Sequence, residues 1–165
     1  MTVTVRPAHT DDLTELAEIG ELTVRAYAAD AFIDPAEDYA HQLRDAATRA
    51  REAEIYVALL HDHVAGTVTF CPKGSPWCEL ARDDEGEFRM LAVSPEARRR
   101  GVAGALVGVC IERARELGYA ALVLSSLPEQ KPAHQLYERL GFRRTPHLDW
   151  SPAPGVDLLA FRLDL

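Results

Sequence analysis

Residues 91–106 read LAVSPEARRRGVAGAL, and this stretch determines the fold that we expect for the chain. It passes from an apolar strand over 87–93, through a short basic connection over 94–100, into a helix over 101–117. Gly118 follows at the position where a left-handed helix cap is expected. The other elements of the fold are arranged around this junction of strand and helix.

The junction has the composition of an anion site. Backbone N–H groups at a helix start have no partner within the helix, and the helix dipole adds about half a positive charge there. Gly101 and the small residues 103 and 104 let a phosphate approach the main chain, and Arg98–Arg100 offer charge-assisted hydrogen bonds. A diphosphate is the expected ligand, although the same turn would also serve simply as a helix cap with solvated arginines. The patterns of dinucleotide and Walker A loops are missing, which disfavours those ligands.

Hydrophobic periodicity predicts alternating strands and helices on both sides of this junction. Before it we expect a strand over 2–6, a helix from Asp12, a second helix over 34–51, and a hairpin over 54–60 and 64–70. After it we expect a strand over 120–127, a helix over 132–140, a strand from 142 and a last strand over 156–163. The segments 72–86 and 146–155 are predicted to be a long loop and a turn-rich connection. This order predicts an α/β fold with a mixed sheet covered by helices.

The composition is that of one globular domain over residues 1–165. The chain is 47% hydrophobic and 27% charged, and its formal net charge of −8 disfavours binding to nucleic acid. No apolar run approaches the roughly 20 residues that span a bilayer, and the first residues lack a signal-peptide pattern. We therefore expect a cytoplasmic protein with no membrane partner. Lysine is scarce beside arginine, which suggests GC-rich coding, and we expect a bacterial source. A homodimer is compatible with the sequence.

The cysteines do not indicate a disulfide framework or a metal site. They are three, Cys71, Cys78 and Cys110, at irregular positions. Cys71 and Cys78 follow His61 and His63 but lack the close spacing of common zinc sites, so no metal is expected. Cys110 falls on the predicted core face of its helix, where a buried thiol is expected.

Two motifs give the chain a family resemblance. The stretch quoted above, together with LYERLGF over 136–142, resembles the GNAT superfamily of N-acetyltransferases. Arg98, Gly101 and Ala103 match the pattern Gln/Arg-x-x-Gly-x-Gly/Ala, and the second stretch matches Leu-Tyr-x-x-x-Gly-Phe. The resemblance implies a mostly antiparallel, twisted sheet of about seven strands with about four helices, splayed between the fourth and fifth strands.

The resemblance also implies a site for acetyl-coenzyme A. The diphosphate is expected on the helix start, and the pantetheine arm is expected along the preceding strand, where its amides pair with exposed main-chain groups. Gln130 stands where many members carry an asparagine that contacts the cofactor. The expected cofactor-binding residues are Leu91, Ala92, Val93, Arg98, Arg99, Arg100, Gly101, Val102, Ala103, Gly104, Gln130 and Tyr137.

Acyl transfer also needs groups that move protons. An amine is mostly protonated at neutral pH, so a base is required before nitrogen can attack, and Glu87 is the candidate. The leaving thiolate needs a proton, and Tyr137 occupies the family's usual position for a general acid. The simpler explanations are that Glu87 belongs to a solvated acidic run and that Tyr137 is a packing residue.

The acceptor is the least determined part of the prediction. Tyr27, Phe32, Ser125 and Trp150 are the expected substrate-binding residues, and Asp149 beside Trp150 would suit an ammonium group. We expect the primary amine of a small molecule, with protein N-termini or lysines as the alternative. A coenzyme A-binding sensor without catalysis, and a nucleotide-binding protein outside this family, are the hypotheses of other classes.

Overall fold

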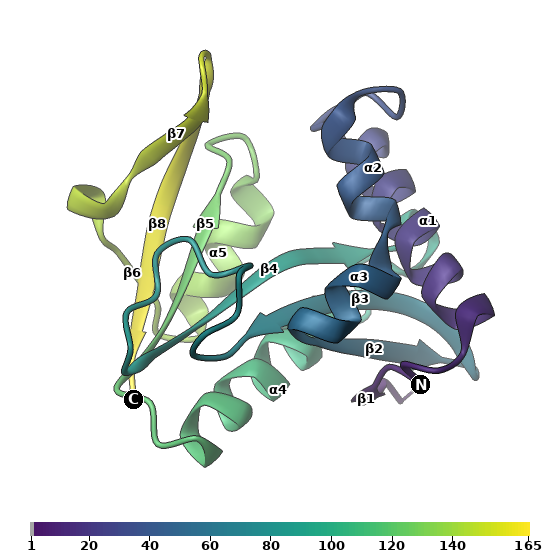
Figure 1. The fold of residues 1–165 in the computed structure, drawn as a ribbon, viewed down its shortest axis with the longest axis horizontal. Coiled ribbons are helices and arrows are strands. Elements are labelled where there is room, and N and C mark those ends of the chain that lie inside the picture. Colours follow the sequence, from purple (N-terminus) through teal and green to yellow (C-terminus); the bar gives the residue numbers. More distant parts are fainter. Residues whose placement is uncertain (1) are drawn as a thin grey trace.

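A computed structural model describes residues 2–165 as a mixed sheet with helices on both faces (Figure 1). The strands are β1 (Thr4–Pro7), β2 (Glu54–Leu60), β3 (His63–Cys71), β4 (Glu85–Val93), β5 (Ala121–Ser126), β6 (Arg143–Arg144), β7 (Trp150–Ala153) and β8 (Val156–Asp164). The α-helices are α1 (Leu13–Ala29), α2 (Asp38–Arg44), α3 (Ala46–Glu52), α4 (Val102–Glu116) and α5 (Lys131–Arg139). Short 3-10 turns occupy Pro95–Ala97 and Pro146–Leu148. None of the helices in the described chain is long and apolar enough to cross a membrane.

The sheet is antiparallel except at its centre. Its order is β1-β2-β3-β4-β5-β8-β6, and β7 pairs with β8. β4 and β5 run parallel, and their pairing covers only residues 85–87 of β4 against residues 121–123 of β5. Beyond Glu87 and Val123 the two strands separate, which leaves a wedge between them. The expected splay between the fourth and fifth strands is therefore confirmed.

The helices divide the core between the two faces of the sheet (Figure 1). On one face, α4 contributes Leu106, Val107 and Cys110 to the largest apolar cluster, which also contains Phe88 and Phe161. On the other face, α1, α2 and α3 pack over β2, β3 and β4 in smaller clusters. The burial of Cys110 is confirmed, since its exposed fraction is 0%. The long loop between β3 and β4 lies on the same face as α1–α3.

Two local predictions were wrong. The helix expected over 34–51 is broken at Asp45, whose side chain accepts a hydrogen bond from the Thr48 backbone and so begins α3. The guanidinium of Arg49 donates to the carbonyls of Gln42 and Leu43, which satisfies the end of α2. The segment 146–155 was expected to be a turn-rich connection without a strand of its own, but it also contains β7, which makes the sheet eight-stranded.

Gly20 explains how α2 lies so close to α1. A Cβ at this position would stand 2.2 Å from the Arg44 carbonyl oxygen, so only glycine permits the contact. The start of α1 follows the expected pattern, because the Asp12 side chain accepts a hydrogen bond from the Glu15 backbone at 3.1 Å. Glu15 itself turns back to Arg6 and to the His9 backbone. These contacts fix α1 and α2 over the end of β4.

Candidate active site

The wedge between β4 and β5 contains a cavity of about 30 Å³. Residues from four elements line it: Tyr27, Phe88, Arg89, Met90, Leu91, Ser125, Ser126, Gln130 and Tyr137. Five of these were expected site residues, namely Tyr27, Leu91, Ser125, Gln130 and Tyr137. The structure therefore brings together residues that are more than 100 positions apart in the chain.

The start of α4 opens toward solvent with its main chain uncovered. Gly101 has φ +78°, and a Cβ built there would meet nothing within 4 Å. No side chain of residues 2–165 caps this helix start. The first-turn N–H groups therefore face open space, as the binding of a phosphate group requires. Gly104 also leaves room, with Leu136 Cδ1 at 3.7 Å from a built Cβ.

The three arginines before this helix differ in their surroundings. Arg98 donates to Asp30 Oδ1 at 2.8 Å and to the Ala26 carbonyl, so it ties the connection to the end of α1. Arg99 is exposed and has φ +64°, a conformation that non-glycine residues rarely adopt. Arg100 is exposed as well. Arg99 and Arg100 thus lie at the surface beside the open helix start, whereas Arg98 holds the local structure.

A bulge in β4 shapes the wall of the wedge. Val68 of β3 faces two residues of β4, because pairing passes from Thr69–Arg89 to Thr67–Ala92, and Met90 has φ +56°. Met90 and Ala92 pack against α1 and α2, while Phe88 and Leu91 face the cluster of α4. The side chain of Ala92 is therefore turned away from the wedge, as is that of buried Val102. Only the main chain of these two residues is available to a ligand.

Tyr137 stands at the apex of the wedge. It is 4% exposed and makes edge or tilted contacts with the rings of Phe88, Phe142 and Phe161 at 5.7–5.9 Å. Burial raises the pKa of its phenol above the ordinary value. The phenol oxygen makes no hydrogen bond to any residue in the described part of the chain. A protonated hydroxyl is thus held at the cavity by packing of the ring alone.

Glu87 is fully buried at the point where β4 and β5 part. Its Oε1 accepts three backbone N–H bonds, from Glu79, Leu80 and Ala81, at 2.8–2.9 Å. Its Oε2 is buried without a hydrogen-bond partner among residues 2–165. Burial raises the pKa of Glu87 although the three N–H groups act in the opposite direction. The carboxyl therefore belongs to the loop face of β4, opposite Phe88, and does not line the cavity.

The end of β5 carries a connected set of polar groups. Gln130 Oε1 accepts from the Ser126 hydroxyl and from the Leu127 backbone, both at 2.8 Å, and His134 Nε2 lies 3.0 Å from Ser126 Oγ. The Trp150 indole donates to Ser125 Oγ at 3.0 Å. Because the Gln130 oxygen is occupied, its amide nitrogen is the atom that remains for a ligand in the wedge.

Three residues considered for the acceptor, Phe32, Asp149 and Trp150, do not line the cavity. Phe32 packs edge-on against Tyr27 at 6.4 Å but does not line the cavity. Asp149 binds Arg144 through both oxygens and also accepts from the Ala160 backbone, so it is not available to an ammonium group. The sequence reasoning passed over Arg89, the one charged residue within 88–93. Such an isolated charge in an apolar strand was the signal that could have found it.

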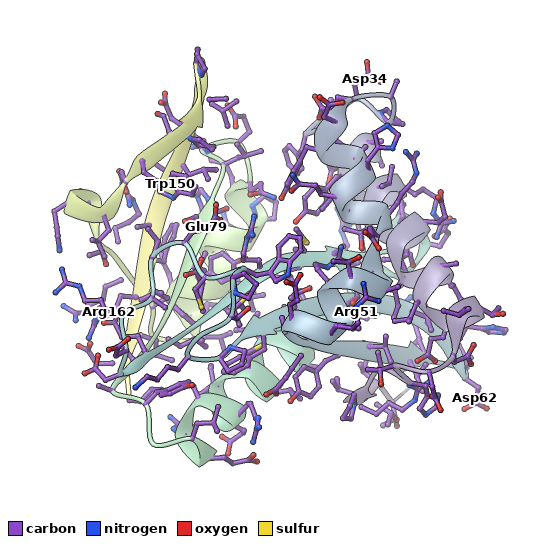
Figure 2. The ribbon with its side chains drawn as sticks, viewed as in Figure 1. Asp34, Arg51, Asp62, Glu79, Trp150 and Arg162 are labelled. Carbon is purple, nitrogen blue, oxygen red and sulfur yellow. The ribbon has the colours of Figure 1, made fainter. Side chains whose placement is uncertain are left out.

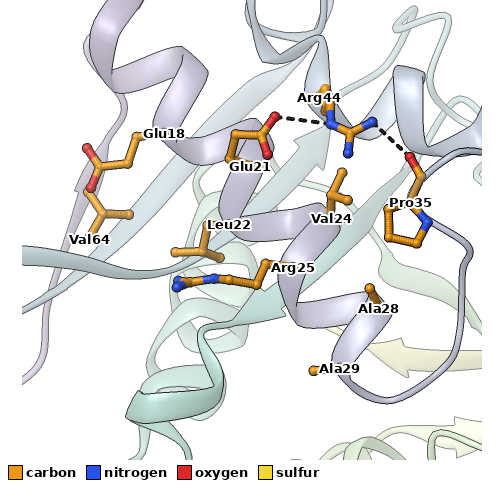
Figure 3. Close-up of a pocket in the computed structure, with 10 residues that line it drawn as sticks. All are labelled: Glu18, Glu21, Leu22, Val24, Arg25, Ala28, Ala29, Pro35, Arg44 and Val64. Carbon is orange, nitrogen blue, oxygen red and sulfur yellow. Dashed lines mark hydrogen bonds and ion pairs between the residues drawn. The ribbon is translucent and has the colours of Figure 1, made fainter.

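A second hollow is separate from this site. An open depression of about 760 Å³ runs along the outer side of α1, where Arg44 bonds Glu21 and the Pro35 carbonyl (Figure 3). It shares no lining residue with the wedge cavity. In the described chain no group of three or more His, Cys, Asp or Glu could hold a metal ion.

A sheet splayed at a parallel pair, with an open helix start at one end of the wedge and a buried tyrosine at the other, defines an N-acyltransferase fold. The model of the Acetyltransferase (GNAT) family matches residues 17–142, and the chain belongs to this family. The predicted family and fold are thereby confirmed.

Relatives and solved structures agree with this assignment. An N-acetyltransferase of Schizosaccharomyces pombe is 33% identical over 96 residues, which cover 58% of this chain and 55% of that protein. The N-acetylaspartate synthetase of Danio rerio is 34% identical over 103 residues, covering 61% and 33%. The chain thus matches about half or less of their length. A GNAT family acetyltransferase from Elizabethkingia anophelis with acetyl-CoA bound has the same fold, with a TM-score of 0.70, 19% identity and coverage of 99% and 98%.

Proposed function

We propose that this chain transfers an acetyl group from acetyl-coenzyme A directly to the primary amine of a small molecule. The observation that carries the proposal is the wedge, whose β4 edge leads from Tyr137 to the open start of α4. An acyl carrier with a diphosphate at one end and a thioester at the other suits these two ends. Direct transfer follows because donor and acceptor would meet in the same cavity.

The residues present fit the coenzyme A portion. The first-turn N–H groups of α4 and the exposed Arg99 and Arg100 would hold the phosphates. The unpaired edge of β4 over 88–93 offers main-chain groups to the pantetheine amides, and the Gln130 amide nitrogen faces the same space. When bound, the group supplies a thioester whose carbonyl carbon accepts the amine. The backbone near Leu91 would stabilise negative charge on the acetyl oxygen.

Tyr137 is proposed as the general acid. Its raised pKa keeps the phenol protonated at neutral pH, and its hydroxyl is not engaged by another residue in the described chain. As the carbon–sulfur bond breaks, the phenol proton passes to the departing sulfur. The phenolate then recovers a proton from solvent or, through it, from the base. A phenol held only by its ring has the freedom to follow the sulfur.

Glu87 is proposed as the base that accepts the proton of the amine. A raised pKa makes a carboxylate a better acceptor near neutral pH, and Oε2 is unsatisfied within residues 2–165. Buried oxygens of this kind are commonly satisfied by water. Because Glu87 does not line the cavity, the proton would travel through such a water.

The acceptor would enter from the face of α1 and the loop. Tyr27 on α1 lines the cavity, and so does Ser125 on β5, whose hydroxyl accepts a hydrogen bond from the Trp150 indole. The cavity is small, so the reacting end of the acceptor must be slender. The similarity to a synthetase named for N-acetylaspartate supports a small molecule over a protein chain.

Two measurements test this proposal. Calorimetry is expected to show uptake of acetyl-coenzyme A by the folded protein, and thiol release is expected with some members of a panel of amines. Uptake without turnover of any amine would indicate the non-catalytic sensor instead. Preference for peptides with free N-termini or lysines would indicate a protein acceptor. Protection against thermal unfolding by ATP or NAD, and none by acetyl-coenzyme A, would contradict the proposal altogether.

A further inference from the structure

Arg89 is the only charged side chain among the residues that line the wedge cavity. Because of the bulge at Met90, the side chains of Arg89 and Met90 both lie toward α1, α2 and the loop, away from Phe88. The side chain of Arg89 is 16% exposed, so its charge is largely removed from water. A guanidinium stays charged at any physiological pH. A fixed positive charge at the cavity therefore affects which acceptor molecules can bind there.

The guanidinium of Arg89 contacts a carboxylate, a carbonyl, an aromatic ring and a hydroxyl. Nε lies 3.0 Å from Glu79 Oε1, Nη1 donates to the Trp77 carbonyl at 3.3 Å, and the group stacks over the Trp77 ring at 5.6 Å. The Tyr39 hydroxyl is a further hydrogen-bond partner of this guanidinium. Figure 2 shows Glu79 on the loop that lies over the sheet. A guanidinium has five N–H donors in a fixed fork, and Nη2 makes no hydrogen bond to a carboxylate or carbonyl of residues 2–165.

The charges around Arg89 favour a further anion. The second guanidinium on this face, Arg49, is 1% exposed, and its hydrogen bonds go to Thr69 and to two main-chain carbonyls rather than to a carboxylate. Glu87 directs its bonded oxygen to backbone N–H groups rather than to a guanidinium. Within residues 2–165, Glu79 is the carboxylate that pairs with Arg89, and no carboxylate pairs with Arg49. Two guanidinium groups on this face thus share one paired carboxylate, which favours a further anion.

We propose that Arg89 binds a carboxylate of the acceptor, so that the acceptor is an amine that carries a carboxylate close to its amino group. This inference rests on the proposed acetyl transfer, because the amine must reach the thioester near Leu91 and Tyr137. Arg89 and Leu91 both line the cavity and lie on either side of the bulge at Met90. A carboxylate within a few bonds of the amine, as in an amino acid, suits two groups that lie so close in the chain.

The experiment compares acceptors that differ only in this carboxylate. Thiol release from acetyl-coenzyme A is measured with the α-amino acids, β-alanine and γ-aminobutyrate, each beside its carboxamide, and with short peptides of free N-terminus. We expect carboxylates to be used with a kcat/KM roughly 10- to 100-fold above that of the matched amides, as for a charge-assisted hydrogen bond. Arg89→Gln should remove this preference by raising the KM of the carboxylate acceptor, with the KM of acetyl-coenzyme A unchanged.

Two further variants keep the result interpretable. Arg89→Lys retains the charge without the fork and should restore part of the preference. Arg113→Gln removes an ion pair between α4 and Glu54, away from the wedge, and should leave the kinetics of both acceptors of a pair unchanged. Thermal unfolding monitored by circular dichroism shows whether each variant is folded.

The outcomes separate this inference from the function on which it rests. If acetyl-coenzyme A is bound but amides or peptides are used as well as carboxylates, or no carboxylate-bearing amine is used, the role of Arg89 is overturned and the acetyl transfer is not. An equal loss for both members of a pair in Arg89→Gln overturns it as well. If acetyl-coenzyme A is not bound at all, the proposed function fails first.

Discussion

One side of the wedge offers mainly main-chain groups to a ligand, and the other offers side chains. The side of α4 and α5 offers the main chain of 88–93, the open start of α4 and one ring, that of Tyr137. The side of α1, α2 and the loop offers side chains, among them Tyr27, Arg89 and Trp77, which come from elements far apart in the sequence. The first side suits a ligand that is the same throughout a family. The second side can change residue by residue without disturbing the fold.

The two sides should also differ in which substitutions damage them. Main-chain groups cannot be removed by substitution, so the first side is damaged chiefly by added bulk or charge at a glycine. The second side loses a contact with each side chain that is exchanged. The following predictions test whether the two sides behave independently, from the largest expected effect to the smallest.

Gly101→Glu is expected to abolish cofactor binding, with a loss of affinity of at least about 100-fold. The new carboxylate would stand in the open space before the α4 start and repel phosphate, and φ +78° strains any side chain. Calorimetry with coenzyme A measures the loss. Gly118→Glu is the matched control, since Gly118 has φ +73° and equally open surroundings at the other end of α4. If both variants lose coenzyme A equally, the effect is one of folding rather than of the site.

Tyr137→Phe is expected to lower kcat on the order of 100-fold while the affinity for acetyl-coenzyme A changes less than about twofold. The ring packing with Phe88, Phe142 and Phe161 is kept, and only the proton donor is removed. Steady-state kinetics with direct binding separates the two quantities. Tyr56→Phe, which loses a hydroxyl bonded to Glu54 outside the wedge, should have normal turnover. Unchanged kcat in Tyr137→Phe would remove the assigned acid.

Glu87→Gln is expected to lower kcat/KM by roughly 10- to 100-fold and to remove the acid limb of its pH profile. Burial raises the pKa of Glu87 above its ordinary value of 4.5, so the limb of the parent protein should lie above that pH. A parent profile without such a limb would argue that Glu87 only holds the loop at residues 79–81.

The same pKa gives a stability prediction with a defined sign. Between pH 4.5 and the raised pKa, the folded protein keeps a proton on Glu87 that the unfolded chain releases. The contribution of Glu87 to the free energy of unfolding is therefore full below that window and declines as pH rises through it. Glu87→Gln should lack this decline, which urea unfolding of both proteins at several pH values measures.

Gln130→Ala is expected to raise the KM of acetyl-coenzyme A about five- to tenfold, as for one lost hydrogen bond. The Ser126 hydroxyl and the Leu127 backbone would also lose their acceptor. Gln130→Asn shortens the side chain and should give a smaller effect. An unchanged KM in both variants would show that the cofactor side uses main-chain groups alone.

The fold, including the open start of α4, was predictable because its signals are local. The α4 start depends on a glycine followed by small residues, and α4 over Val102–Glu116 matches the helix expected over 101–117. The burial of Cys110 follows from its helical spacing. Local sequence patterns of this kind carry the fold, so the family and the splayed sheet were predicted correctly. The roles of Glu87 and Tyr137 stay predictions.

Several contacts on the acceptor side could not be predicted from the sequence because they are not local, and the residues that bind the acceptor stay a prediction. The bulge occurs at Met90, a residue that gives no sign of a positive φ, and it reverses which later side chains of β4 face α1. Asp149 was expected to be available, but Arg144 five residues earlier binds it through both oxygens. The break at Asp45 was visible as a capping residue before Thr48, yet the alanine-rich stripe around it favoured one continuous helix.

The order of the strands also affects how the chain is made. β5 is apolar and buried, and its second edge is covered by β8, while residues 127–155 are synthesised between the two. A nascent chain therefore exposes an unpaired edge of β5 until β8 has left the ribosome. Deleting β8 would leave that edge uncovered permanently, and we expect such a truncated chain to be recovered as aggregates.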